Sequence, residues 1–174
     1  SVVESEMPIN LIVQGAGTLE IIGSEVAGVD VIAKETSTVV LDGSTIDGAI
    51  TTSWDSMATI EIYDTELVQA PILSGFAVGH FTNTSVPSIV VEDSAVALIY
   101  RWIHVTVFDG AGNPLPSATA TARFLINGTY WSSATSDSAG IARVSSLGTI
   151  ITASGSTFVG NYKINVTYVY DSVA

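Results

Sequence analysis

The amino-acid sequence predicts an all-β protein, in which a short parallel β-helix is followed by a small antiparallel β-sandwich. Two observations predict this fold. A phrase of alternating apolar and polar residues recurs at intervals of about 20 residues in the first hundred positions, and short strand patterns separated by turn residues fill the remainder. We therefore expect a β-helix domain over residues 1–100 and a β-sandwich domain over residues 101–174.

The repeated phrase occurs in four segments that align in six columns: GTLEIIGSEV (17–26), STVVLDGSTI (37–46), ATIEIYDTEL (58–67) and PSIVVEDSAV (87–96). Apolar residues two positions apart are typical of a strand, and Gly or Asp followed by Ser or Thr is typical of a turn. A strand, a turn and a second strand in every repeat indicate one coil of a β-solenoid, in which equivalent residues stack ~4.8 Å apart.

The elements of this β-helix follow from the repeat. Residues 9–13 are expected as the tail of an incomplete first coil, and the second strand of each coil is expected at 29–33, 49–53, 70–74 and 99–103. The last spacing is 29 residues, whereas the others are 20 and 21, which predicts a loop leaving the coil near residues 76–86. The repeat therefore predicts about four coils around an inner wall of Leu, Ile and Val.

The pattern changes after Tyr100. Ile103, Val105 and Val107 alternate with other residues, and a cluster of turn formers follows at 110–114. A second strand–turn–strand pattern covers 133–144, and a final strand is expected over 162–170. Several short strands separated by turn signals are typical of a β-sandwich.

The stretches VTVFDGAGNPLPSATA, TSDSAGIARV and YKINVTY resemble the carboxypeptidase regulatory-like, or transthyretin-like, β-sandwich family. The matching positions are Val105, Val107, Asp109, Gly112, Pro114, Leu115, Ala118, Asp137, Gly140 and Tyr162. This resemblance implies an Ig-like accessory module of extracellular proteins that has no catalysis of its own. The coil region similarly resembles the short right-handed β-helices of archaeal and bacterial surface proteins.

Composition excludes several classes of partner. Seventeen acidic residues against five basic ones give a net charge of −12, which would repel nucleic acid and anionic bilayers. There is no cysteine for disulfides or thiolate metal sites, and no run of 18 apolar residues for membrane insertion. Ser1 indicates a mature protein or an excised fragment. Low charge combined with 40 Ser and Thr residues favours an extracellular or cell-surface location.

Three sequons predict N-glycosylation, at Asn83, Asn127 and Asn165. Asn83 is expected in the loop that leaves the coil and Asn127 at a hairpin turn. Asn165 alternates with the apolar Ile164 and Val166, so it should point outward from the last strand.

No catalytic, cofactor-binding or metal site is expected. Asp42, Asp64, Glu92 and Asp93 are expected near one turn edge and could gather Ca²⁺, as in polysaccharide-active β-helix enzymes, but Asp is also a common turn residue. The two histidines, His80 and His104, lack a third ligand. The candidates for stacking on a sugar are Trp54, Tyr63, Phe76 and Trp131.

The functional prediction rests on the two exposed ends of a short solenoid. Each end is a row of unpaired backbone groups, which invites pairing unless it is covered. The second module follows the last coil directly and can cover the downstream end, whereas SVVESE offers no obvious cap upstream. The sequence therefore predicts a non-enzymatic structural protein of a filament, sheath or surface layer, which self-associates as a homopolymer or joins neighbouring surface-protein domains. The alternatives are a carbohydrate-binding or adhesion module and, third, a polysaccharide-active enzyme.

Overall fold

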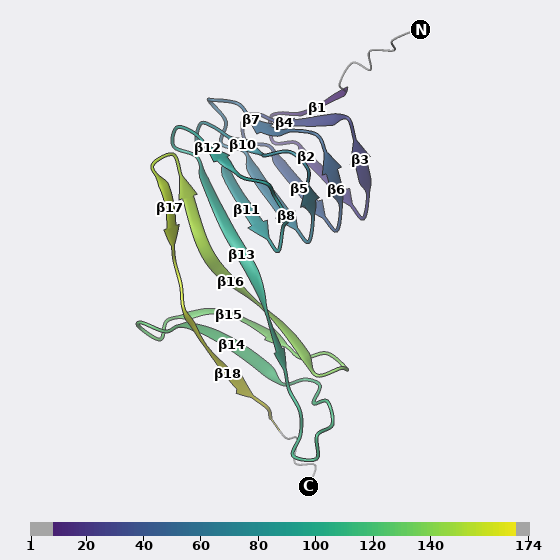
Figure 1. Cartoon of the computed structure of the whole chain (residues 1–174), viewed down its shortest axis with the longest axis vertical. Helices are drawn as coiled ribbons and strands as arrows, with labels where there is room; N and C mark the ends of the chain where they lie inside the picture. Colours follow the sequence, from purple (N-terminus) through teal and green to yellow (C-terminus); the bar gives the residue numbers. More distant parts are fainter. Residues whose placement is uncertain (1–8, 170–174) are drawn as a thin grey trace. The chain divides into compact units, whose positions relative to one another are not determined.

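The computed structural model describes residues 9–169, in which every regular element is a β-strand (Figure 1). The predicted all-β class is confirmed. The chain forms two compact units, one comprising Ser1–Ile99 with Ile150–Thr157 and the other Tyr100–Thr149 with Phe158–Ala174.

The coils of the first unit contribute strands to three sheets in turn. The first sheet contains, in order, β1 (Ile9–Val13), β4 (Val29–Ala33), β7 (Ile50–Thr52), β10 (Ile72–Leu73) and β12 (Val90–Val91). The second contains β2 (Thr18–Ile22), β5 (Thr38–Asp42), β8 (Thr59–Tyr63) and β11 (Val78–Thr82), and continues through β13 (Val96–Thr106), β16 (Ile141–Thr152) and β17 (Gly155–Phe158). The third contains β3 (Glu25–Ala27), β6 (Thr45–Asp47) and β9 (Glu66–Leu67). Successive coils pair in parallel, as a solenoid requires.

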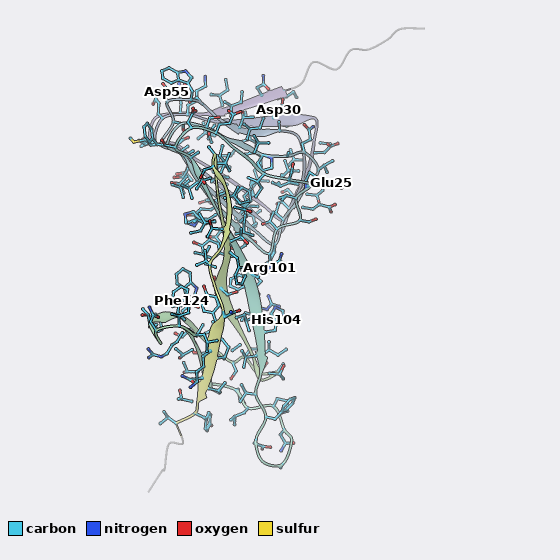
Figure 2. All side chains as sticks on the ribbon, turned by 60° about the vertical axis from the view of Figure 1, so that its left-hand side comes forward. Glu25, Asp30, Asp55, Arg101, His104 and Phe124 are labelled. Carbon is cyan, nitrogen blue, oxygen red and sulfur yellow. The ribbon has the colours of Figure 1, made fainter. Side chains whose placement is uncertain are left out.

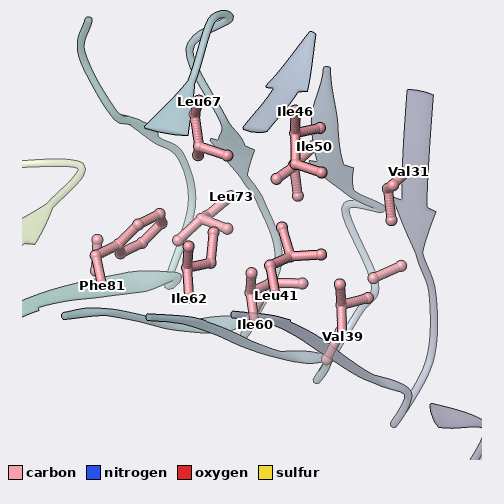
Figure 3. Close-up of a cluster of buried hydrophobic side chains, with 14 of the residues drawn as sticks. Val31, Val39, Leu41, Ile46, Ile50, Ile60, Ile62, Leu67, Leu73 and Phe81 are labelled. Atoms are coloured by element: carbon pink, nitrogen blue, oxygen red, sulfur yellow. The ribbon is translucent and has the colours of Figure 1, made fainter. Parts of the chain in front are cut away.

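Alternate residues of these strands point inward and stack in columns. Val39 pairs with Ile60 and Leu41 with Ile62 across adjacent coils, and all four are fully buried (Figure 3). Burial of such side chains contributes about 1.5–3 kcal/mol each, so the columns are the main stabilising feature of the unit.

One corner of the coil explains the recurring turn phrase. Gly23, Gly43, Asp64 and Asn83 occupy equivalent positions, and all four have positive φ, between 45° and 57°. The Ser or Thr after each of them turns its hydroxyl back to a backbone carbonyl two residues earlier, as in the 2.9 Å bond from Ser44 to Asp42 and the 2.7 Å bond from Thr65 to Tyr63. The same hydroxyl oxygens of Ser44 and Thr65 accept an N–H from the coil before. The corner therefore selects Gly, Asp or Asn followed by Ser or Thr.

The predicted alignment of the fourth repeat is wrong. β8 pairs with β11, so that Thr59 lies beside Val78, and the true spacing is 19 residues instead of 29. Residues 78–82 form a strand of the coil, although a loop was expected near 76–86. The segment PSIVVEDSAV instead supplies β12 in the first sheet and the start of β13 in the second. The first sheet has five strands, the number predicted, but its fifth strand is β12 and not residues 99–103.

A change of side-chain volume hid the fourth repeat. Gly79 stands beside Ile60, where the other coils have a large apolar residue, and Phe81 stands beside Ile62. A Cβ added at Gly79 would lie 2.6 Å from Phe81 Cε2 and 2.7 Å from Leu73 Cδ1. The Phe81 ring therefore occupies the space that a side chain at position 79 would need. The core stays packed at this coil, although the sequence has no apolar side chain at position 79 to indicate it.

The expected second strands are mostly confirmed. β4 has the predicted bounds, and β7 and β10 lie within the predicted ranges 49–53 and 70–74. The range 99–103 is wrong, because it falls inside β13 in the second sheet. Residues 9–13 do form a strand of the first coil, whereas SVVESE lies outside the described residues.

Residues 150–157 cover part of the downstream end of the first unit. They include the end of β16 and most of β17, which extend the second sheet beyond β13. Ile151 packs against the buried core of the coils. Sequence reasoning assigned this cover to the second module in general, and the structure attributes it to these eight residues.

The second unit contains an antiparallel sheet of β14 (Thr119–Phe124), β15 (Tyr130–Thr135) and β18 (Tyr162–Thr167), with β14 in the centre. Its small core joins Ala120 and Ala122 of β14 to Ala142 and Val144 of β16. The Tyr162 hydroxyl donates to Leu147 O at 2.9 Å and accepts from Leu147 N at 3.1 Å, so the last strand is attached to β16.

Candidate functional site

The first coil is the clearest unpartnered surface among the described residues. β1, β2 and β3 are each the terminal strand of their sheet, and they lie together at the same end of the stack (Figure 1). One end of the solenoid therefore presents three strand edges at once.

The hydrogen bonds show which backbone groups face outward from this end. On either side of β2, Gly17 O accepts from Thr38 N at 2.9 Å, and Gly23 N donates to Asp42 O at 2.8 Å. Because alternate residues of a parallel strand address opposite neighbours, odd-numbered residues of β2 bond to β5, and Thr18, Glu20 and Ile22 present their N–H and C=O groups to the open edge. By the same alternation, the backbone N–H and C=O groups of Asn10 and Ile12 in β1 point away from β4 and toward the open edge.

The inward side chains of the first coil are only partly covered. Leu11 is paired with Val31 and Leu19 with Val39, yet Val31 and Val39 are fully buried whereas Leu11 is 37% exposed and Leu19 is half-buried. Leu11 and Leu19 are apolar like the core residues of the later coils, but no further coil covers them on their outer side. This end can therefore pair with another β-edge through backbone hydrogen bonds and apolar contact together.

Two acidic side chains lie on this edge. Glu20 and Glu25 lie on the edge strands and are exposed, and Glu25 lies on the outer side of the coil (Figure 2). Their charges would oppose the approach of another acidic chain at low ionic strength, and salt would screen that repulsion. Any association through this end should therefore strengthen with salt.

A second feature is an apolar corner on the middle coils. Trp54, Met57 and Phe76 are 78%, 60% and 63% exposed. Phe76 N donates to Ser56 O at 2.8 Å, and a Cβ added at Gly75 would lie 2.5 Å from Trp54 O, so the three residues occupy adjacent layers of one corner. This corner of the coil therefore exposes three large apolar side chains, two of them aromatic.

The other two stacking candidates are placed differently. Tyr63 is half-buried, and its hydroxyl donates to Glu61 at 3.3 Å. Trp131 lies among Tyr100, Phe124 and Tyr162, with its ring 5.3 Å from that of Phe124. Trp131 therefore packs within the second unit. Tyr162 belongs to the same aromatic group, and partial burial of its own hydroxyl raises the pKa of Tyr162.

The four acids considered for calcium are not brought together. Asp64 accepts from Asn83 at the corner after the second sheet, whereas Glu92 accepts from Ser74 and Asp93 from Gly75 at the corner after the first sheet. No group of three or more His, Cys, Asp or Glu side chains within residues 9–169 is arranged to hold a metal ion. His80 lies on β11 and His104 on β13, so they belong to different strands.

The three sequon asparagines are all exposed, in three different settings. Asn83 lies at a stacked corner of the coil, although a loop was expected there. Asn127 lies in the turn between β14 and β15, as expected, and Asn165 lies on β18.

Comparison with protein-family models, with curated proteins and with solved structures finds no match for this chain. No helix in the described part of the chain is long and apolar enough to cross a membrane.

Sequence reasoning missed two of these features. Met57 was not singled out, because nothing in the sequence distinguishes an exposed methionine at a corner from a buried one. The edge strand β17, all four residues of which are exposed, was also missed, because Gly155–Phe158 is short and has no apolar alternation.

Proposed function

We propose that the protein is a non-enzymatic structural component of a cell-surface filament, sheath or surface layer, which assembles through exposed β-edges. The observation that carries this proposal is the first coil, in which three strand edges and partly exposed inward side chains lie at one end. β17 provides a further exposed edge at the other end of the second sheet. A module with unlike edges at its two ends can associate head to tail, and such contacts build open chains.

The extracellular location belongs to this proposal. The low charge, the abundance of Ser and Thr and the three exposed sequons support it. The resemblances to transthyretin-like modules and to surface β-helices support the same assignment.

Association of the purified chain tests the proposal. Sedimentation velocity and negative-stain microscopy at increasing protein and salt concentration should detect oligomers or filaments. Glu20→Pro removes one N–H from the open edge of β2 without removing a bond to β5, so it should weaken assembly and leave the monomer folded. Glu20→Ala is the matched control that keeps the N–H. A folded monomer at all concentrations, or equal assembly by both variants, would contradict the proposal.

The exposed corner of Trp54, Met57 and Phe76 favours a second candidate function, that of a carbohydrate-binding or adhesion module. Aromatic rings with free faces stack on the apolar faces of sugar rings. Glycan-array binding that is lost in Trp54→Ala and Phe76→Ala but kept in Tyr63→Ala would support this function. Absence of binding by the wild-type chain would remove it.

A further inference from the structure

We infer that only one of the three sequons is an acceptor site on the folded protein: Asn127, in the turn between β14 and β15. The inference rests on the proposed extracellular function for the compartment in which a glycosyltransferase meets the chain. The choice among the sites rests on their local structure alone. A transferase must take an asparagine and the hydroxyl residue two positions later into its own peptide-binding groove, so both must be able to leave their contacts.

The Asn83 sequon is held by hydrogen bonds to the preceding coil. Asn83 Nδ2, the nitrogen that would receive the sugar, donates to Asp64 Oδ1 at 2.6 Å. Ser85, which supplies the required hydroxyl, donates its N–H to Thr65 O at 3.0 Å and accepts from Leu67 N at 2.8 Å. The intervening Thr84 directs its hydroxyl to backbone carbonyls of its own coil and of the one before. Presentation of this sequon to an enzyme would require the corner of the solenoid to open.

The Asn165 sequon lies within a strand. Asn165 pairs with Thr121 and Thr167 with Thr119, so the acceptor and the hydroxyl residue are both in the register of β14. β18 is a terminal strand of its sheet, and its free side remains accessible. Modification here requires the strand to detach from β14.

The Asn127 sequon is in a projecting turn. Asn127, Gly128 and Thr129 are all exposed, and the neighbouring Ile126 is 96% exposed. The Asn127 side chain accepts Thr129 N at Oδ1 at 3.0 Å, and this bond does not engage Nδ2. The backbone of Gly128 and Thr129 bonds to Phe124 and Arg123, and all of these partners lie within the same hairpin. This sequon can enter an enzyme groove when the bonds of its own turn to Phe124 and Arg123 open, while the residues from Thr119 to Ala122 stay paired with β15.

The chemistry is a group transfer from a lipid-linked oligosaccharide. Asn127 Nδ2 forms a bond to the anomeric carbon, the bond from that carbon to the phosphate oxygen breaks, and the lipid diphosphate leaves with the electron pair. The proton lost by the amide passes to a base of the transferase. A glycan at this position would also cover the exposed side chains of Leu125 and Ile126, which otherwise form an apolar tip.

The test is an in vitro transfer reaction with a purified single-subunit oligosaccharyltransferase and its lipid-linked donor, and peptide mass spectrometry as the readout. The folded chain is compared with free synthetic peptides of residues 78–90, 121–133 and 160–171, which correct for the preference of the enzyme among the three sequons. Relative to its own peptide, Asn127 should react at a similar rate. Asn83 should react on the order of 100-fold more slowly, because only the opened corner is a substrate.

Two variants sharpen the result. Thr129→Ala keeps Asn127 but removes the hydroxyl, and it should abolish modification of the folded chain. Ile60→Asp buries a charge in the coil core, and it should raise modification at Asn83 and leave that at Asn127 unchanged. Equal peptide-corrected rates at Asn83 and Asn127, fastest reaction at Asn165, or no reaction of the folded chain would each overturn the inference. Sedimentation of the same sample tests the proposed assembly independently, so the two ideas can fail separately.

Discussion

Replacement of Gly79 by valine tests the packing of the coils most sharply. Gly79 is buried on β11, and a Cβ there would lie 2.6 Å from the Phe81 ring and 2.7 Å from Leu73 Cδ1. Its φ is not positive, so the cost of a side chain is steric and not conformational. Overpacking of this kind costs about 1–3 kcal/mol, and we expect Gly79→Val to lower the free energy of unfolding by that amount.

The compensating change gives the stronger form of the prediction. Phe81→Leu alone should also be destabilising, by about 1–3 kcal/mol, because it leaves a cavity beside Gly79. The double variant places Val and Leu where the preceding coil has Ile60 and Ile62, so it should recover to within about 1 kcal/mol of the wild type.

Urea unfolding at 25 °C, followed by tryptophan fluorescence and circular dichroism, measures the four free energies of this cycle. Gly110→Val is the control, because a Cβ at Gly110 meets nothing within 4 Å. Strictly additive losses in the double variant, or no loss in Gly79→Val, would refute the idea that Phe81 occupies the space vacated by Gly79.

Three further predictions concern the second unit. Gly140 has a φ of 73°, and a Cβ there would lie 2.5 Å from Val107 O, so Gly140→Ala should destabilise this unit by about 1–3 kcal/mol in thermal unfolding, and an unchanged melting temperature would contradict the close approach. Tyr162→Phe leaves Leu147 N–H and C=O without their shared partner and should cost about 1–3 kcal/mol; a neutral effect in urea unfolding would show that water replaces the hydroxyl. The Asn113 side chain and backbone hold the pKa of Asp109 below its usual 3.8, so this carboxylate contributes stability above the unfolded-state pKa that is lost as the pH falls through the folded-state value. Carboxyl titration by NMR should give a pKa below 3.8 in the wild type and one nearer that value in Asn113→Ala, and equal values in both would be inconsistent with the hydrogen bonds.

Most of the solenoid could be predicted because its first three coils repeat both chemistry and spacing. Leu19, Val39 and Ile60 form one apolar column, and the corner phrase of Gly or Asp with Ser or Thr follows each of them at the same distance. The fourth coil could not be predicted in this way. Gly79 interrupts the apolar column, and only the contact with Phe81, which is a tertiary feature, shows why the column tolerates it.

The candidate site was predictable in kind but not in detail. An open solenoid end follows from the repeat itself, whereas the identity of the outward-facing groups depends on which residues bond to the next coil. The exposure of Trp54 and the packing of the half-buried Trp131 against Phe124 could not be read from sequence, because both are aromatic residues next to polar ones. Likewise, the three sequons look equivalent until the bond from Asn83 to Asp64 is seen.

Amide hydrogen exchange of β2 as a function of protein concentration tests the central claim most directly. In dilute solution Glu20 N–H should exchange quickly while Ile21 N–H, which bonds to β5, is protected. At concentrations at which sedimentation detects oligomers, Glu20 N–H should become protected to a similar degree, because the open edge is then paired. Rapid exchange of Glu20 N–H within the oligomer, or its protection in the dilute monomer, would contradict assembly through the first coil.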